Sequence, residues 1–358
     1  MRFVLKTNYG QDINHFLHNG QRFWYGLLIA ALLLAPFFVD RFYVGELTYL
    51  LIWVIAGTGL MLLIGYTGLV SMGHAAFMAI GAYAHAVLFK LGFPFGISLL
   101  MAGLVSGFLG AVIGIAALRM TGIYLAVATI SFAFIIEKIV GEWTSVTGGH
   151  RGFVVPEPVM FGIDFGSDMS FYYLCLGVVI VAVMLVLNLL RSPMGRAMIA
   201  VRDSEISAQA MGVNLVETKT LAFTLSAFFT GLAGALYSHK IGMLFPENFT
   251  IFMSIKLLIL VVVGGIGSMH GIVFGAIFIS ILPQVIAIVR DFLPTVIAQR
   301  RGLEPLVFGS ILLLFLIYEP LGLYGRWVKI RAYFTQFPLY RRATFKRQKS
   351  YLRTERVH

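Results

Sequence analysis

Residues 47–64 read LTYLLIWVIAGTGLMLLI, a run of apolar residues without a charged side chain. A bilayer core about 30 Å thick is crossed by about 20 helical residues, and every backbone amide inside it must be hydrogen bonded within the protein. This run therefore predicts a transmembrane helix. The whole chain agrees with it, because 59% of its residues are hydrophobic and only 12% are charged, against about 25% charged in a soluble domain.

Similar runs recur along the chain and predict about ten spans. They lie at residues 23–39, 47–64, 72–89, 95–117, 121–140, 171–190, 219–240, 251–266, 270–289 and 303–320. The predicted fold is all-α, a polytopic transmembrane helical bundle over residues 23–325. A polar segment, 1–22, precedes it and a basic tail, 326–358, follows it. Because 1–22 is not a short charged leader, the first span is expected to be retained.

The basic residues indicate how the chain is oriented. The 27 lysines and arginines cluster at the ends of the apolar runs, and with the N-terminus inside most of them fall on one side. An excess of Lys and Arg marks the cytoplasmic side, so both termini are predicted there. The net charge of +11 then fits attraction to anionic membrane lipids, and the distribution argues against a nucleic-acid partner.

No enzyme site is predicted. The single cysteine, Cys175, lies within an apolar run and has no charged neighbour to activate it. The histidines do not have the spacing of metal ligands, and a Gly-x-Ser-x-Gly nucleophile motif is missing from the sequence. We therefore expect no catalytic residue, no metal and no cofactor.

Two loops are long. Residues 141–170 fall on the external side and residues 191–217 on the cytoplasmic side. In the second loop, Pro193 is expected to end the preceding span, and Asp203 or Ser204 to cap a short helix that Gly212 and Asn214 close.

This short helix has the composition of a docking element. Small side chains, Ala208 and Ala210, suit a groove on a partner. The charged residues Arg196, Arg202, Asp203 and Glu205 rim it, and Gly212 ends it.

Two glycine-rich stretches occupy similar places in the two halves of the chain. Residues 65–74 read GYTGLVSMGH and residues 264–271 read GGIGSMHG, and each joins two adjacent apolar runs. Paired glycine interruptions point to broken or re-entrant helices at a transporter's substrate site. Glycines also let helices pack closely in membranes. The alternative that these glycines serve only helix packing therefore stays open.

Polar side chains near these stretches are candidates for the substrate pathway. The set is Tyr66, Thr67, Ser71, His74, Lys256 and Ser268. An ionisable group in a bilayer is expensive, which draws attention to Lys256. It would meet a substrate carboxylate, extend to the interface or pair with Glu247. His74 would contact substrate or join two helices by a hydrogen bond.

At this point the chain resembles a known family. Residues 195–214, GRAMIAVRDSEISAQAMGVN, with Lys219, Ala222-Phe223 and Ser226-Ala227, are similar to the coupling-helix region of branched-chain amino acid ABC permeases. Residues 65–77 and 264–268 also match the glycine-rich stretches of that family. The LivM-like subunit is the closer of its two related permeases, and the resemblance covers residues 25–325.

The resemblance implies an importer of several subunits in the inner (plasma) membrane of a prokaryote. The expected partners are a second, LivH-like permease, two cytoplasmic ATPase subunits and a periplasmic or external solute-binding protein. The sequence has no Gly-x-x-x-x-Gly-Lys-[Ser/Thr] loop, so ATP hydrolysis is expected on a partner. The expected substrates are branched-chain or other amino acids. Urea and short-chain amides, carried by close relatives, stay open, as does an ion-coupled secondary transporter.

Overall fold

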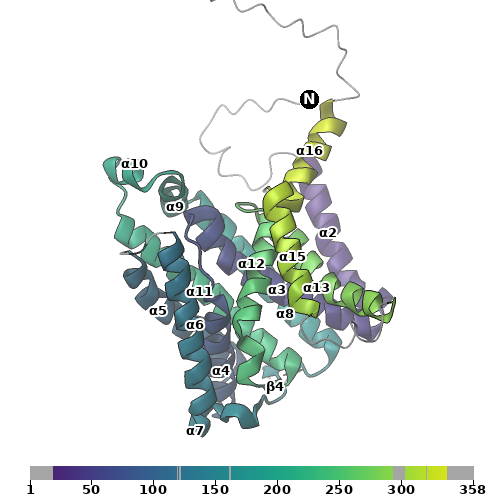
Figure 1. The fold of residues 1–358 in the computed structure, drawn as a ribbon. Helices are drawn as coiled ribbons and strands as arrows, with labels where there is room; N and C mark the ends of the chain where they lie inside the picture. Colours follow the sequence, from purple (N-terminus) through teal and green to yellow (C-terminus); the bar gives the residue numbers. More distant parts are fainter. Residues whose placement is uncertain are drawn as a thin grey trace, which may run out of the picture.

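The computed structural model describes residues 19–118, 120, 122–160, 163–292, 303–319 and 321–336. They form a bundle of helices (Figure 1). Within these residues eight helices are long and apolar enough to cross a membrane, and the bent pair α15–α16 raises the number to nine. The predicted polytopic helical bundle is confirmed.

Each of the ten predicted spans has a helix at its position. The helices are α2 (Asn19–Phe38), α3 (Arg41–Thr67), α4 (His74–Lys90), α5 (Phe95–Ala117), α6 (Ile123–Glu142), α8 (Asp168–Arg191), α11 (Leu215–Ile241), α12 (Ile251–Gly264), α13 (Met269–Phe292) and α15 (Leu303–Tyr318), followed by α16 (Gly322–Gln336). With 17 residues, α4 is too short to count among the crossing helices. The expected ten spans thus become eight or nine.

Helix α11 lies at the centre of the bundle and packs against α3, α4 and α5. Small residues make this possible, as is usual where helices meet in membranes. A Cβ atom at Gly81 of α4 would collide with the backbone of Gly231, and one at Gly234 with the carbonyl of Met78. The glycines of α5 that face α11 are Gly103, Gly107, Gly110 and Gly114.

Helices α2 and α3 follow each other in sequence but differ in burial. In the most apolar 18-residue stretch of α3, 83% of the residues are buried, against 6% in the corresponding stretch of α2. The outer helix α2 is held by two tyrosines of α8, whose hydroxyls donate to the carbonyls of Leu32 and Leu33 at 2.8 Å. Helix α3 is therefore part of the core, and α2 lies on the rim.

The external loop predicted at 141–170 and the segment that precedes α12 meet at one end of the bundle, which we call the loop end (residues 143–160, 163–166 and 242–250). It contains the short elements α7 (Thr144–Thr147), η1 (Gly149–Arg151), β1 (Phe153–Val154), β2 (Val159–Met160), β3 (Ile163–Asp164), β4 (Met243–Leu244) and η2 (Pro246–Phe249). Strand β1 pairs antiparallel with β4, and β2 with β3.

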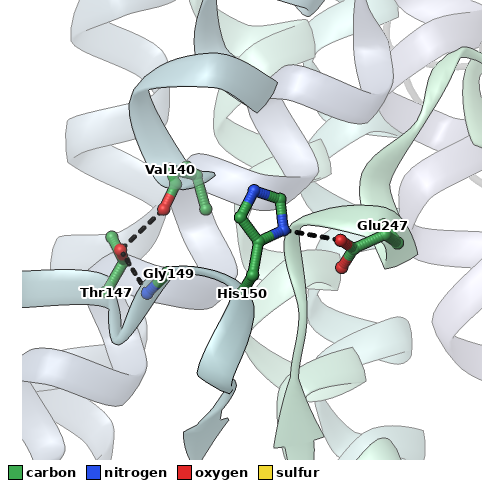
Figure 2. Close-up of polar contacts among 5 residues, drawn as sticks. All are labelled: Val140, Thr147, Gly149, His150 and Glu247. Atoms are coloured by element: carbon green, nitrogen blue, oxygen red, sulfur yellow. Dashed lines mark hydrogen bonds and ion pairs between the residues drawn. The ribbon is translucent and has the colours of Figure 1, made fainter. Parts of the chain in front are cut away.

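Polar contacts hold the loop end together (Figure 2). Thr147 donates its hydroxyl hydrogen to the carbonyl of Val140 at 2.7 Å and accepts from the amide of Gly149 at 3.2 Å. The His150 ring is 2.7 Å from a carboxylate oxygen of Glu247, which joins η1 to η2. Glu247, considered above as a partner for Lys256, is thus bonded to His150.

Two expected boundaries fall inside helices. Helix α2 begins at Asn19, before the expected boundary at 22, and α16 continues through the expected boundary at 325. The remainders of the two terminal segments, 1–18 and 337–358, lie outside the described residues.

Candidate coupling site

The segment between α8 and α11 forms two short helices, α9 (Pro193–Asp203) and α10 (Glu205–Ala210), at the end of the bundle opposite the loop end (Figure 1). Three side chains cap its turns. The Ser192 hydroxyl accepts from the Gly195 amide at the start of α9, and the Ser204 hydroxyl caps α10 in the same way. The side chain of Asn214 caps α11. Such caps satisfy amides that have no partner within their own helix.

The predicted short helix is α10, and Ser204 caps it as one of the two expected residues. Gly212 follows it with a φ of 85°, a left-handed conformation that favours glycine. The preceding span ends before Pro193, as expected, but Pro193 also begins α9, since proline suits the first turn of a helix. One expectation was wrong. Asn214 begins α11 and does not close α10.

A partly buried ion pair fastens α10 to the bundle. The Lys219 ammonium donates to a Glu205 carboxylate oxygen at 2.6 Å, and the Lys219 side chain is only 3% exposed. A buried cation needs such a partner to offset its desolvation. Helix α9 adds apolar contacts, because Met198 belongs to a buried cluster with Leu63 and Phe223. The two short helices are therefore anchored to α3 and α11.

The outer surface of this segment carries two large apolar side chains. Ile206 is 84% exposed and Met211 is 85% exposed. Ala210 is exposed beside them, as expected. Ala208 differs from expectation: it is 3% exposed because it packs inward, so it does not line an outer docking surface. Ile206 and Met211 were not singled out from the sequence, although an isoleucine and a methionine in a polar loop were the available signal.

Arg202 joins α9 to the first glycine-rich stretch. Its Nη1 donates to the carbonyl of Gly65 at 3.0 Å, while Nε and Nη2 donate to a carboxylate oxygen of Asp203 at 3.1 and 3.0 Å. The Arg202 stem crosses Gly68, where an added Cβ would lie 3.0 Å from its Cγ. Arg196, in contrast, donates to the carbonyl of Arg191 in the adjoining turn.

The second glycine-rich stretch meets the first at this place. The amide of Gly267 donates to the sulfur of Met61 at 3.2 Å, and a Cβ added to Gly65 would lie 2.8 Å from the Gly267 nitrogen. Gly265 packs against the bend between α15 and α16, where a Cβ would lie 2.9 Å from the Leu321 carbonyl oxygen. We call this meeting of residues 65–68, 202, 264–267 and 321–322 the glycine junction.

Two of the predicted pathway residues form a buried network deeper in the bundle. The Ser71 hydroxyl is 3.1 Å from Nδ1 of His74, and Nε2 of His74 is 2.7 Å from the hydroxyl of Ser226. The amide of Ala75 donates to the Ser254 hydroxyl at 2.9 Å. Ser226 lies about 16 Å along α11 from its first residue, so α4 begins well inside the bundle. The sequence did not single out Ser226 or Ser254 as partners of this turn.

The other predicted pathway residues lie apart from that network. Tyr66 is half-buried near Arg202 in the glycine junction. The Thr67 hydroxyl donates to the Leu62 carbonyl within α3, and the Ser268 hydroxyl accepts from the Gly271 amide at the start of α13. The Lys256 ammonium lies 5.1 Å from the centre of the Phe308 ring of α15.

Comparison with known proteins identifies the family to which this architecture belongs. Residues 42–317 match the family model described as the branched-chain amino acid transport system / permease component. The chain belongs to this family. No solved structure matches it.

Curated relatives agree with the permease family. The high-affinity branched-chain amino acid transport system permease proteins LivM of Salmonella typhimurium strain LT2 and Escherichia coli K12 are each 34% identical over 324 residues, which cover 83% of this chain and 74% of theirs. The autoinducer 2 import system permease protein LsrC of Escherichia coli O9:H4 is 27% identical over 297 residues, 77% of this chain and 82% of its own length.

The family match divides this permease into two parts. It runs from the start of α3 almost to the end of α15 and therefore contains α9, α10, both glycine-rich stretches and the His74 network. Helices α2 and α16 lie outside it. The chain is thus a multi-pass membrane protein and a transport permease component.

Proposed function

We propose that this chain is one permease subunit of an ABC importer, in which α9 and α10 receive force from ATPase subunits. The observation that carries the proposal is the exposure of Ile206 and Met211 on a segment anchored by the Lys219–Glu205 ion pair. A large apolar side chain in water favours burial in a partner. Because the chain itself has no phosphate-binding loop, ATP hydrolysis belongs to that partner.

The proposed orientation follows from charge and from the two ends of the bundle. The α9–α10 end carries Arg191, Arg196 and Arg202, and α16 adds Arg326 and Lys329. We assign this end to the cytoplasm of a prokaryotic inner membrane, together with both termini. The loop end would then face the periplasm or exterior and receive a solute-binding protein. A second, LivH-like permease would complete the pathway.

The proposed substrates are branched-chain amino acids, which the two LivM relatives carry by name. The LsrC relatives, named for autoinducer 2, mark another solute class within the wider group of similar permeases. Urea and short-chain amides remain a further alternative. The greater identity to LivM, 34% against 27%, favours the amino acids.

The proposed substrate pathway includes Tyr66, Thr67, Ser71, His74, Lys256 and Ser268. Lys256 offers a direct test, because an ammonium beside the pathway would attract the carboxylate of an amino acid. With Lys256→Met, leucine uptake is expected to fall with a raised KM. Unaltered leucine uptake would reduce Lys256 to a packing contact with Phe308.

The deciding experiment is uptake into proteoliposomes that hold the whole complex, with the binding protein outside and ATP inside. Labelled leucine, urea and autoinducer 2 are compared. Leucine uptake that requires both ATP and the binding protein supports the proposal. Urea or autoinducer 2 uptake alone would keep the architecture and overturn the substrate. Uptake that persists without the ATPase subunits would instead indicate an ion-coupled carrier.

A further inference from the structure

The guanidinium of Arg202 is hydrogen bonded to the first glycine-rich stretch and lies close to the second. It donates to the Gly65 carbonyl at 3.0 Å, and an added Cβ at Gly267 would lie 3.4 Å from the same Nη1 atom. Two further donors, Nε and Nη2, bond to Asp203, the last residue of α9. One side chain thus connects the end of α9 with residues from α3 and from the α12–α13 turn.

The contact has the chemistry of a helix cap. The last carbonyls of a helix have no amide partner within it, and a cation there is favourable because the carbonyl end of a helix is negative. In α3 the carbonyls of Leu63 and Ile64 accept from the backbone amides of Leu69 and Gly68. The Gly65 carbonyl accepts from Arg202. The C-terminus of α3 is therefore completed by a side chain from α9.

The other contacts that anchor α9 and α10 do not involve the glycine junction. Glu205 is tied to Lys219 on α11, and Met198 packs against Leu63 and Phe223. Helix α11 is continuous from Leu215 to Ile241 and has no break near Lys219. The glycine junction, in contrast, has left-handed glycines: Gly68 has a φ of 74° and Gly267 a φ of 83°. Glycines change backbone conformation without a Cβ clash, so the breaks are suited to act as hinges.

We propose that Arg202 is the positioning residue that transmits displacement of α9–α10 to the glycine junction, so that both broken segments move together. This inference rests on the proposed function. A displacement of α9 pulls on the Gly65 carbonyl through the guanidinium, and the close packing of Gly65 against Gly267 carries the movement to the second stretch. Removal of the side chain leaves α10 docked through Ile206 and Met211, but releases the two breaks from it.

The test is the number of ATP molecules hydrolysed for each leucine transported by the reconstituted complex. With Arg202→Gln, the ATPase subunits are expected to co-purify and to hydrolyse ATP, while this ratio rises about ten-fold, the factor for a charge-assisted hydrogen bond of about 1.4 kcal/mol. Arg202→Lys should give a smaller rise, because an ammonium keeps the charge and donates to one partner, although it lacks the planar fork needed for both Gly65 and Asp203. Arg290→Gln, an exposed arginine at the far end of α13, is the matched control and should leave the ratio unchanged.

A spectroscopic readout separates transmission from a merely structural role. Cys175, the single cysteine of this chain, is buried, so in this subunit a spin label at Ile266→Cys reports on the junction. Its spectrum is expected to change with nucleotide when Arg202 is present, and not with Arg202→Gln. An unchanged ATP-to-leucine ratio in Arg202→Gln, or a label that still responds to nucleotide, overturns the inference. Absence of ATP-dependent uptake with Arg202 in place overturns the proposed function, and this inference with it.

Discussion

The two glycine-rich stretches look alike in sequence but are held in different ways. The first, residues 65–74, turns into the bundle and is fixed by side chains: His74 bonds to Ser71 and Ser226. The second, residues 264–271, makes a tight turn between α12 and α13 that is packed backbone against backbone, beside bonds from the Gly267 and Gly271 amides to Met61 and Ser268. A Cβ at Gly264 would collide with the carbonyl of Gly271.

The difference shows that glycine serves two purposes here. In the first stretch it lets the chain leave α3 and start α4 at another depth, and hydroxyl and imidazole groups then define that depth. In the second it lets two helices approach until no side chain fits between them. The first stretch should therefore respond to loss of polar partners, and the second to added volume.

The largest effect is expected from Gly264→Leu. Overpacking commonly costs about 1–3 kcal/mol, and more where the new side chain meets backbone that has no room to move. We expect little monodisperse protein after detergent extraction and a strongly lowered Tm. Gly177→Leu on α8, where an added Cβ has nothing within 4 Å, is the control and should behave like the parent. A normal Tm for Gly264→Leu would contradict backbone packing in the second stretch.

His74→Ala should have the next largest effect. It leaves the buried hydroxyls of Ser71 and Ser226 without the imidazole, and each unsatisfied group costs about 1–3 kcal/mol. The measurement is the Tm of His74→Ala, Ser226→Ala and the double variant. Because both residues share one bond, the losses should be clearly less than additive. Additive losses would mean that the His74–Ser226 bond does not fix the start of α4.

A smaller effect is expected from Met61→Leu. The change removes the sulfur that accepts from the Gly267 amide and keeps nearly the same volume, so it should cost less than about 1.5 kcal/mol. The thermal shift is compared directly with that of His74→Ala. A loss as large as that of His74→Ala would mean that side-chain acceptors hold the second stretch as well.

The smallest effect is expected at the bend that packs on Gly265. Arg326 and Lys329 donate to the two carboxylate oxygens of Glu319 at 2.9 and 3.2 Å. Protonation of the carboxylate removes the charge that strengthens these bonds, so their contribution is lost in acid. Glu319→Gln should therefore lower Tm slightly at neutral pH, and the difference should vanish on acidification. A difference that persists in acid would point to lost packing instead.

The length and composition of the apolar runs were enough to predict the helices. Each segment that crosses the bilayer must by itself be long and apolar and must satisfy its own backbone hydrogen bonds. The depth of α4 was not predictable, because it depends on Ser226 and Ser254, which are distant in sequence. Helix α9 was missed because its proline was interpreted only as a helix end. In the coupling site, charge and small size drew attention to Arg202 and Ala208. Exposure of Ile206 and burial of Ala208 depend on which face α10 turns to α11, which the sequence of a short helix leaves open.

The position of α4 has a consequence for how the protein is made. Its start relies on partners from α6, α11 and α12, since the Met72 amide donates to Thr129, the Ala75 amide donates to Ser254 and the His74 ring bonds to Ser226. An unpaired amide in hydrocarbon costs several kcal/mol, so this turn has no stable place in the membrane before those helices exist. We expect α4 to reach its final depth only after the ribosome has passed residue 254. Helix α4, although synthesised early, would be among the last helices to reach its final position.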